Sequence, residues 1–244
     1  MKKILSIGLL ALSLTACTGI SEKHKSSPHF VDGKFQNTYP KEGDRSFGKM
    51  FKALFTEEGA DWPDWIENEF SPKLKDDNEK NVVVTFIGHA TFLIEIEKHN
   101  ILIDPIFSKT AGPASWLGAK RKRNPELQLD ELPQIHTLLV SHNHYDHLDL
   151  PSLKAIQKNN PKVLLVVPLG DKNWLEKEGF KNVVELDWWE SIQVSDAIEV
   201  FFTPAQHSSG RGLFDREESF WGINTLKLKF FMEEIQVTLI IFVK

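Results

Sequence analysis

The stretch "SHNHYDHLD", from Ser141 to Asp149, holds three of the chain's nine histidines together with two aspartates. It follows "HTLLV", an apolar run that predicts a buried strand, so the histidines are expected in a loop at the end of that strand. Imidazole nitrogens and carboxylate oxygens are ligands that zinc accepts, and a strand end fixes the geometry of its loop. A solvated polar loop has no need for this density of titratable groups. His142, His144, Asp146 and His147 are therefore the candidate metal ligands.

The segments around this loop predict a layered α/β fold. "VVVTFIGHATFLIEIEKHNILIDPIF", from Val82 to Phe107, indicates two or three strands in hairpin connection. Further strands are predicted at 162–170, 182–189 and 197–207, and the spacing of apolar residues predicts helices at 150–160 and 171–179. Hairpin strands combined with strand–helix units favour an α/β sandwich.

Composition limits the classes of function. A chain of 244 residues that is 41% hydrophobic can bury one sizeable core. The net charge of −5 provides no global basic field, so nucleic acid is not an expected partner. The basic run "KRKR", Lys120 to Arg123, has two interpretations: a solvated loop, or a patch that meets anionic head groups or substrate phosphate.

The N-terminus predicts export. Lys2 and Lys3 precede an apolar run from Ile4 to Leu14, which is too short to span a bilayer and is typical of a secretory signal. "LTAC", ending at Cys17, resembles the lipobox of bacterial lipoproteins. The resemblance implies cleavage before Cys17, attachment of lipid to its sulfur, and a membrane anchor on the extracytoplasmic side of the bacterial cell envelope. A plain signal peptide with a chance cysteine is the alternative.

Cys17 is the only cysteine, so no disulfide can form within the chain and no other thiol is available for catalysis or metal binding. The expected organisation follows the changes in composition. It comprises a signal peptide (1–16), a polar lipid-anchored tether (17–46) with solvated histidines at His24 and His29, an N-terminal helical extension (47–80), the main domain (81–231) and a tail (232–244).

The histidine-rich stretch matches the H-x-H-x-D-H signature of the metallo-β-lactamase superfamily. With "VTFIGHATFLIEI", "ILIDPIFS" and "FTPAQHSSGR", the chain from Val82 to Gly222 resembles the branch of N-acyl-phosphatidylethanolamine-hydrolysing phospholipases D. The resemblance implies an αββα sandwich with two zinc ions at the edge of its sheets. It also implies a phosphodiesterase in which a hydroxide shared by the two ions attacks the phosphorus of a membrane phospholipid.

The resemblance also implies a role for each site residue. His142, His144 and His207 would bind the first zinc, and Asp146 and His147 the second, with Asp146 also the expected catalytic carboxylate. Asp104, in "ILIDP", would orient the metal-binding loop from behind the ligands. His89, which follows Gly88, is expected to be structural rather than catalytic.

The chain departs from this family after "SFWG", Ser219 to Gly222. The family's Gly-Asp-Thr-Gly-Tyr motif, whose aspartate bridges the metals, and its later histidine do not occur in the remaining residues. The sandwich is therefore expected to be incomplete at its C-terminus. At most one of the family's two zinc ions is expected to be held tightly, and little activity is expected.

A frameshift would explain this departure. One coding of Phe231 to Thr238, read one base later, encodes Tyr-Gly-Gly-Asp-Thr-Gly-Tyr, so residues 232–244 are predicted to be out of frame. A naturally short paralogue is the alternative. Two other functions stay open: a lactonase or other metallo-hydrolase of the same fold, since fold does not fix substrate, and a non-enzymatic remnant that binds one metal.

Overall fold

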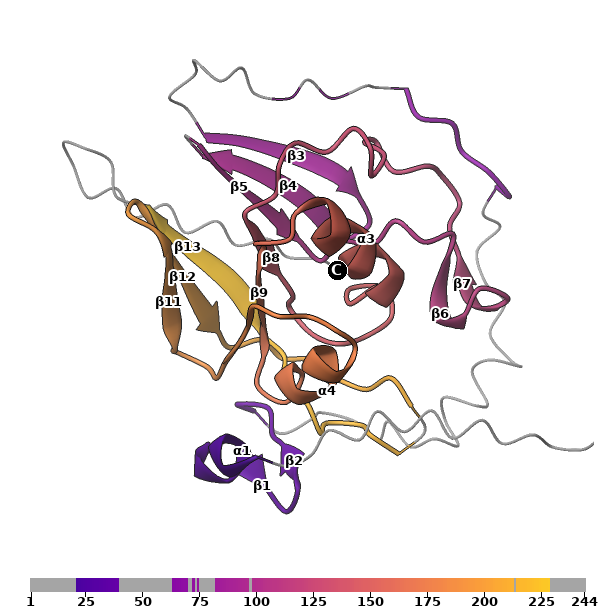
Figure 1. Cartoon of the computed structure of the whole chain (residues 1–244). Coiled ribbons are helices and arrows are strands. Elements are labelled where there is room, and N and C mark those ends of the chain that lie inside the picture. Colours follow the sequence, from indigo (N-terminus) through magenta and orange to yellow (C-terminus); the bar gives the residue numbers. More distant parts are fainter. Residues whose placement is uncertain are drawn as a thin grey trace, which may run out of the picture.

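The computed structural model describes residues 21–39, 63–69, 72, 74, 82–96, 98–212 and 214–228. The predicted signal peptide, the lipidation residue Cys17, most of the predicted extension at 47–80 and the predicted out-of-frame tail lie outside these ranges. The described part forms two main sheets, the larger of them backed by two helices, and two short hairpins (Figure 1).

The larger sheet has six strands and carries both kinds of connection that the sequence predicts. In spatial order the strands are β10 (Val183–Leu186), β9 (Leu164–Pro168), β8 (Thr137–Leu139), β5 (His99–Ile103), β4 (Thr91–Ile96) and β3 (Val82–Gly88). Strands β3, β4 and β5 form an antiparallel meander, whereas β5, β8, β9 and β10 run parallel. Because parallel strands end at one edge of a sheet, the loops after β5, β8 and β9 meet there.

Two helices cover one face of this sheet. Helix α3 (Leu150–Asn159) connects β8 to β9, and α4 (Lys172–Lys177) connects β9 to β10. Their buried side chains Leu153, Ile156 and Leu175 pack with Leu102, Leu138 and other apolar residues of the sheet. Both helices lie in segments whose apolar spacing predicts them.

A second, three-stranded sheet packs on the opposite face. It consists of β11 (Ser191–Ser195), β12 (Ile198–Thr203) and β13 (Ile223–Leu228), all antiparallel. Ile198, Val200 and Phe202 alternate inward along β12 and join the core between the sheets. The predicted α/β sandwich is confirmed as helix, sheet and sheet; in the described ranges no helix covers the outer face of the smaller sheet.

The predicted polar tether is wrong for residues 21–39. These residues form α1 (Glu22–Ser26) and a short hairpin of β1 (Phe30–Val31) and β2 (Lys34–Phe35). Phe35 is fully buried in the core between the sheets, and its ring stacks on Phe220 at 4.5 Å. His24, predicted to be solvated, is only 2% exposed. Isolated aromatic residues in a polar segment bury enough apolar area to order it, a signal that average composition hides.

The helical extension predicted at 47–80 is not helical where the structure describes it. Residues 63–69 adopt no helix, and the Ile66 backbone N–H donates to the Lys122 carbonyl oxygen at 2.7 Å. This hydrogen bond joins Ile66 to a residue far along the chain, whereas a helix would bond its backbone N–H to a carbonyl four residues earlier.

A second hairpin was also not predicted. Strands β6 (Thr110–Ala114) and β7 (Leu117–Lys120) pair antiparallel and project from the body of the molecule (Figure 1). Their small residues lack the alternation of apolar and polar side chains that marks a half-buried strand.

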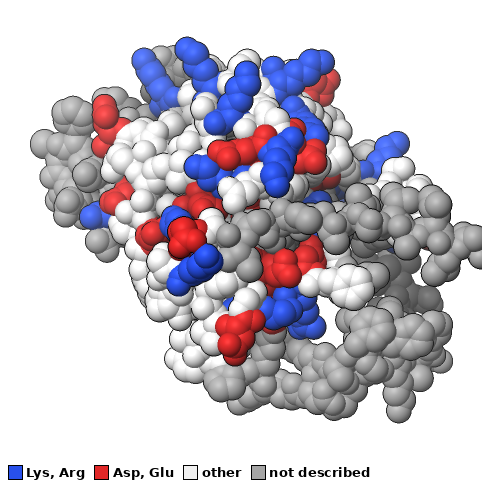
Figure 2. All heavy atoms as spheres, turned by 60° about the horizontal axis from the view of Figure 1, so that its bottom comes forward, with Lys and Arg blue, Asp and Glu red and all other residues white. Residues whose placement is uncertain are grey.

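The described surface carries charges of both signs. On the face in Figure 2, lysine and arginine side chains gather along one rim, with aspartate and glutamate side chains among them. Within the described ranges, no helix has both the length and the apolar character needed to cross a bilayer.

Candidate metal centre

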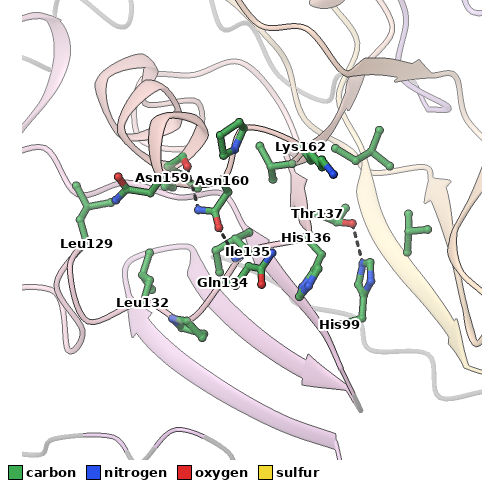
Figure 3. A pocket seen from close by; sticks show the side chains of 16 residues that line it. His99, Leu129, Leu132, Gln134, Ile135, His136, Thr137, Asn159, Asn160 and Lys162 are labelled. Carbon is green, nitrogen blue, oxygen red and sulfur yellow. Dashed lines mark hydrogen bonds between the residues drawn. The ribbon is translucent and has the colours of Figure 1, made fainter. Parts of the chain in front are cut away.

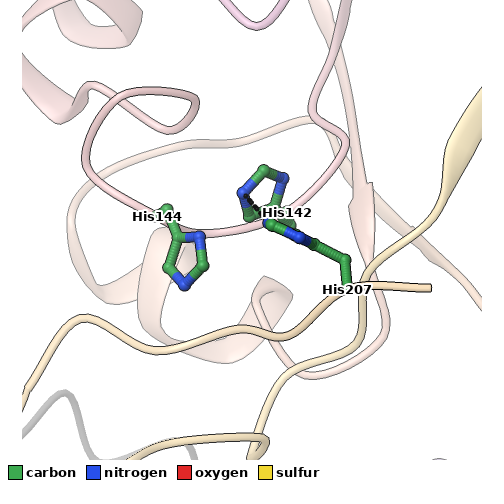
Figure 4. A group of neighbouring side chains, drawn as sticks. All are labelled: His142, His144 and His207. Atoms are coloured by element: carbon green, nitrogen blue, oxygen red, sulfur yellow. Dashed lines mark hydrogen bonds between the residues drawn. The ribbon is translucent and has the colours of Figure 1, made fainter. Parts of the chain in front are cut away.

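Three histidines from both sheets converge at the loop edge. His142 and His144 lie in the loop after β8, and His207 follows β12 (Figure 4). One ligand nitrogen from each ring lies within 4.8 Å of those of the other two. His142 Nε2 is 3.0 Å from His207 Nε2, and the ring centroids of His144 and His207 are 5.2 Å apart. The structure thus brings together the three residues predicted for the first zinc.

Two of these histidines, His142 and His144, favour the neutral form that binds metal. Burial, together with the neighbouring histidines, lowers the pKa of His142 far below its ordinary value, and burial with His207 lowers the pKa of His144 to about 4. A neutral imidazole has a lone pair to offer a metal ion. Ser141 Oγ lies 2.9 Å from His142 Nδ1, which leaves Nε2 facing the group.

A second group of three lies beside the first. His89, Asp146 and His147 bring one ligand atom each within 4.8 Å of one another. His89 Nε2 is 2.9 Å from Asp146 Oδ2, and His147 Nε2 is 3.7 Å from the same oxygen. The His142 and His147 rings lie 4.0 Å apart between centroids, so the two groups adjoin.

His89, which the sequence predicts to be structural, lies within this second group. It occupies the β3–β4 turn in a left-handed conformation, φ +53°, directly after Gly88 at φ +145°. Left-handed backbone is uncommon for residues other than glycine and often marks a functional site. The Gly-His pair between two strands was the available signal, and it became informative only when the fold brought Asp146 to it. The sequence predicts two donors for the second metal, Asp146 and His147, and the structure places His89 beside them as a third.

In the second group, the neighbouring histidines favour the ionised form of the Asp146 carboxyl group. Burial acts to raise the pKa of Asp146, but the hydrogen bond with His89 and the charge of His147 lower it to about 2. Burial acts to lower the pKa of His147, yet the hydrogen bond and charge of Asp104 raise it above its ordinary value. Asp146 is therefore ionised at neutral pH, as a carboxylate ligand must be.

Asp104 lies behind the candidate ligand His147. Its Oδ2 is 2.8 Å from His147 Nδ1, and its two carboxylate oxygens accept from the Ser141 backbone N–H (2.7 Å) and hydroxyl (2.6 Å). Its own backbone is left-handed, φ +42°, and Thr91 Oγ1 donates to its carbonyl oxygen at 2.8 Å. In the neutral form of His147, a carboxylate bonded to Nδ1 keeps the proton on that nitrogen and leaves the lone pair of Nε2 for a metal ion. The orienting role of Asp104 remains a prediction.

A buried network that the sequence did not reveal supports the same loop. Asn143, between the two first-group histidines, donates to Asp171 Oδ1 at 3.1 Å and accepts from the Gly210 backbone at 2.8 Å. The Arg211 guanidinium donates to the carbonyl oxygens of Asn143 (2.8 Å) and Leu148 (2.7 Å). These bonds fix the loop after β8 to the segment that follows His207.

The donor set suits a metal ion of the kind the fold implies. Each group offers three nitrogen or carboxylate-oxygen donors, and the first consists of imidazoles alone, ligands that zinc readily accepts. Nε2 of the buried His142 lies 3.0 Å from Nε2 of the exposed His207, so the two ring nitrogens point at the same position. A shared cation would satisfy those nitrogens.

A pocket of about 850 Å³ lies at the opposite edge of the large sheet (Figure 3). His99, at the start of β5, and His136, just before β8, stack there with centroids 4.9 Å apart. His99 Nε2 bonds Thr137 Oγ1 at 2.9 Å, and burial with the charge of His136 lowers the pKa of His99 to about 4. These two histidines therefore lie apart from the metal centre.

The fold and the convergent histidines define a class, the metallo-hydrolase sandwich. A family model described as the beta-lactamase superfamily domain matches residues 99–224, and the chain belongs to this family. The resemblance inferred from the H-x-H-x-D-H motif is thereby confirmed.

Relatives within the family carry several descriptions. The chain is 38% identical over 152 residues to N-acyl-phosphatidylethanolamine-hydrolyzing phospholipase D 1 of Caenorhabditis elegans, covering 59% of this chain and 43% of the relative. It is 33% identical over 222 residues to an uncharacterized protein of Mycobacterium tuberculosis, covering 88% of this chain and 57% of the relative. A metallo hydrolase from Ignicoccus hospitalis aligns in structure at TM-score 0.46 and 18% identity, covering 60% of this chain and 56% of the other. The chain spans about half the length of the curated relatives it matches.

Proposed function

We propose that this protein is a zinc-dependent hydrolase, and that its substrate is the phosphodiester of an N-acyl-phosphatidylethanolamine-type membrane phospholipid. The observation that carries the proposal is the pair of adjoining three-donor groups, His142–His144–His207 and His89–Asp146–His147. Paired metal sites are typical of phosphodiester hydrolysis. The substrate class is supported by the similarity to the Caenorhabditis elegans phospholipase D.

The chain's own residues would have distinct tasks. His142, His144 and His207 would hold one ion, and the second group the other. Bound metal would supply an activated water molecule and polarise the phosphate oxygens. Asp104 fixes the His147 ring through Nδ1, so that its Nε2 is available to the second group. Asp146, ionised and 2.9 Å from His89 Nε2, would provide the negative charge of that group and is the predicted catalytic carboxylate.

The predicted anchor fits this proposal. A chain tethered by lipid at Cys17 would work at high local concentration of a membrane substrate. Cys17 and the predicted signal peptide lie outside the described residues, so envelope localisation is part of the proposal. Cys17→Ala should leave the protein unprocessed or mislocalised, as read by membrane fractionation.

The test is hydrolysis by the full chain after loading with Zn²⁺. Release of phosphatidate and N-acylethanolamine from N-acyl-phosphatidylethanolamine vesicles is measured beside a panel of lactones. The sequence predicts little activity, but His89 supplies a third donor to the second group, so we expect slow but measurable phospholipid cleavage. This cleavage should be lost in His144→Ala and kept in His136→Ala, a histidine at the opposite edge of the sheet. Lactone cleavage alone would favour the lactonase, and metal binding without any turnover would favour the non-enzymatic remnant; either would overturn the proposed substrate.

A further inference from the structure

The β6–β7 hairpin presents an apolar tip that the fold does not bury. Ala114 pairs with Leu117 to close a tight turn through Ser115 and Trp116. Trp116 is 78% exposed and Leu117 49% exposed. Large apolar side chains at this exposure contribute little to the core, and a two-stranded hairpin has little stability of its own. Exposed apolar side chains of this kind are typical of a surface that binds a partner.

Glycines make the hairpin a thin ribbon. A Cβ on Gly112 would lie 1.9 Å from the Leu117 carbonyl oxygen, and one on Gly118, at φ +141°, 2.1 Å from the Ala111 carbonyl oxygen. The two strands therefore approach too closely for side chains at these positions. Thr110 Oγ1 also donates across the hairpin to the Ser115 carbonyl oxygen at 2.9 Å. The tip is a defined local structure.

The base of the hairpin is basic. The stretch from Ser108 to Pro125 has five lysines and arginines and no acidic residue, in a chain of net charge −5. Lys122 pairs with Asp64 at 3.3 Å, and Arg123 pairs with Glu126. Lys109 and Lys120 are exposed, and no carboxylate of the described residues forms an ion pair with either. Two exposed cations thus lie at the base of a hairpin whose tip is apolar.

The base of the hairpin is hydrogen-bonded to the histidine-rich stretch, Ser141 to Asp149. Arg121 donates to the carbonyl oxygens of Ile106 (2.7 Å) and Ser108 (3.3 Å). Ser108 in turn donates through its backbone N–H (3.1 Å) and hydroxyl (2.9 Å) to Asp149, the last residue of the histidine-rich stretch. The base of the hairpin is therefore connected by hydrogen bonds to the end of the histidine-rich stretch.

We infer that this hairpin docks the protein on an anionic phospholipid bilayer. Trp116 and Leu117 enter the interfacial region, where an amphipathic indole ring is favoured, and Lys109 and Lys120 meet the headgroup phosphates. A neutral apolar partner would leave the cations unmatched, and a purely anionic one would leave the indole in water. The purpose of docking rests on the proposed phospholipid substrate, but the docking itself requires neither metal nor turnover.

The experiment reads the surroundings of the tip directly. Because Cys17 is the only cysteine, a Cys17→Ser background of the full chain accepts one labelled position. Ser115→Cys carries an environment-sensitive fluorophore (NBD) and leaves Trp116 and Leu117 in place. Val31→Cys, on the β1–β2 hairpin and 48% exposed in the native chain, is the matched control. Vesicles of phosphatidylglycerol with phosphatidylethanolamine are compared with phosphatidylcholine vesicles, all without metal.

We expect a blue shift and increased emission at position 115 with the anionic vesicles, weaker with phosphatidylcholine and reduced by salt, and none at position 31. Trp116→Ser with Leu117→Ser should abolish the shift. Lys109→Glu with Lys120→Glu should weaken vesicle affinity on the order of tenfold or more, whereas Lys158→Glu with Lys162→Glu should leave it unchanged. No shift at 115, or equal shifts at 115 and 31, would overturn the inference. Docking without hydrolysis would count against the proposed function alone, and hydrolysis without docking against this inference alone.

Discussion

The carboxylate of Asp104 joins the first residue of the histidine-rich loop, Ser141, to the ring of His147 in the same loop. Its Oδ2 lies 2.8 Å from His147 Nδ1 and accepts from Ser141 Oγ at 2.6 Å. Asp104 is 3% exposed and sits in a left-handed conformation at the end of β5. One buried residue thus bonds both the start of the loop and the ring of a predicted ligand. Backbone strain at such a residue persists because the surrounding bonds fix it.

Asp104→Ala should lower the affinity of the second metal group more than that of the first. Loss of the carboxylate frees the His147 ring to rotate and to change tautomer, and such supporting partners are typically worth about 10–100-fold in metal affinity. Competition titration of Zn²⁺ against a chromophoric chelator measures both affinities. Asp187→Ala, which removes a buried carboxylate outside both groups, is the control. An unchanged second affinity in Asp104→Ala would contradict the orienting role.

The geometry around His89 changes the expected number of metal ions. The sequence predicts at most one tightly held zinc, because it offers only Asp146 and His147 for the second. With His89 Nε2 at 2.9 Å from Asp146, the second group gains a third donor. We expect two equivalents of zinc per chain, the first tighter, and one in His89→Ala.

Elemental analysis after dialysis against low concentrations of Zn²⁺ counts the ions. His136→Ala, at the far edge of the sheet, should retain both, and His144→Ala should retain only the second. One equivalent in the unmodified chain, unaffected by His89→Ala, would restore the estimate made from the sequence and leave His89 as a hydrogen-bond partner of Asp146.

The sequence predicted those parts of the site that local patterns encode. An apolar run before "SHNHYDHLD" places His142, His144 and His147 at the end of a strand, and the same reasoning places His207 after β12. It did not predict His89, because its contact with Asp146 joins residues 57 positions apart. The two turns approach only when β3 and β8 occupy the same sheet.

The errors in the fold have the same origin. Residues 21–39 look polar because Phe30 and Phe35 are separated by residues that face solvent, and only the tertiary structure shows both rings packed 4.8 Å apart. The β6–β7 hairpin escaped prediction because its pairing depends on Gly112 and Gly118 rather than on alternating apolar residues. Long-range burial and close backbone contacts carry no periodic signal in a sequence.

Arg211→Lys should destabilise the protein although it keeps the charge. The guanidinium donates to two backbone carbonyls of the metal-binding loop and stacks on the Tyr145 ring at 4.0 Å. An ammonium cannot reproduce this planar fork, and a buried carbonyl left without a donor costs about 1–3 kcal/mol. Urea unfolding measures the loss. Arg216→Lys, at a side chain that is 50% exposed, should change stability little; equal effects would show that the fork geometry is unimportant.

Asp171 should make the protein less stable as the pH rises from about 4 to about 6. The residue is fully buried, and its Oδ1 accepts from Asn143, Trp174 and Ser219. Its Oδ2 has no hydrogen-bond partner among the described residues. Burial raises the pKa of Asp171 to about 6, although the hydrogen bonds and the charge of Arg211 act to lower it.

Because the folded-state pKa of Asp171 lies above the unfolded value, the protonated residue contributes stability below about pH 4 that is lost as the pH passes about 6. The shift corresponds to about 3 kcal/mol. Asp171→Asn removes the ionisation, so the free energy of unfolding of this variant relative to the native chain should rise by up to about 3 kcal/mol between pH 4 and pH 7. Urea unfolding of both metal-free proteins across this range provides the measurement, and the histidines common to both cancel in the difference.

Asp196→Asn, at an exposed turn, is the control, and its free energy of unfolding relative to the native chain should not change with pH. A flat difference for Asp171→Asn as well would mean that the buried carboxylate is ionised at no cost, with its charge balanced by Arg211.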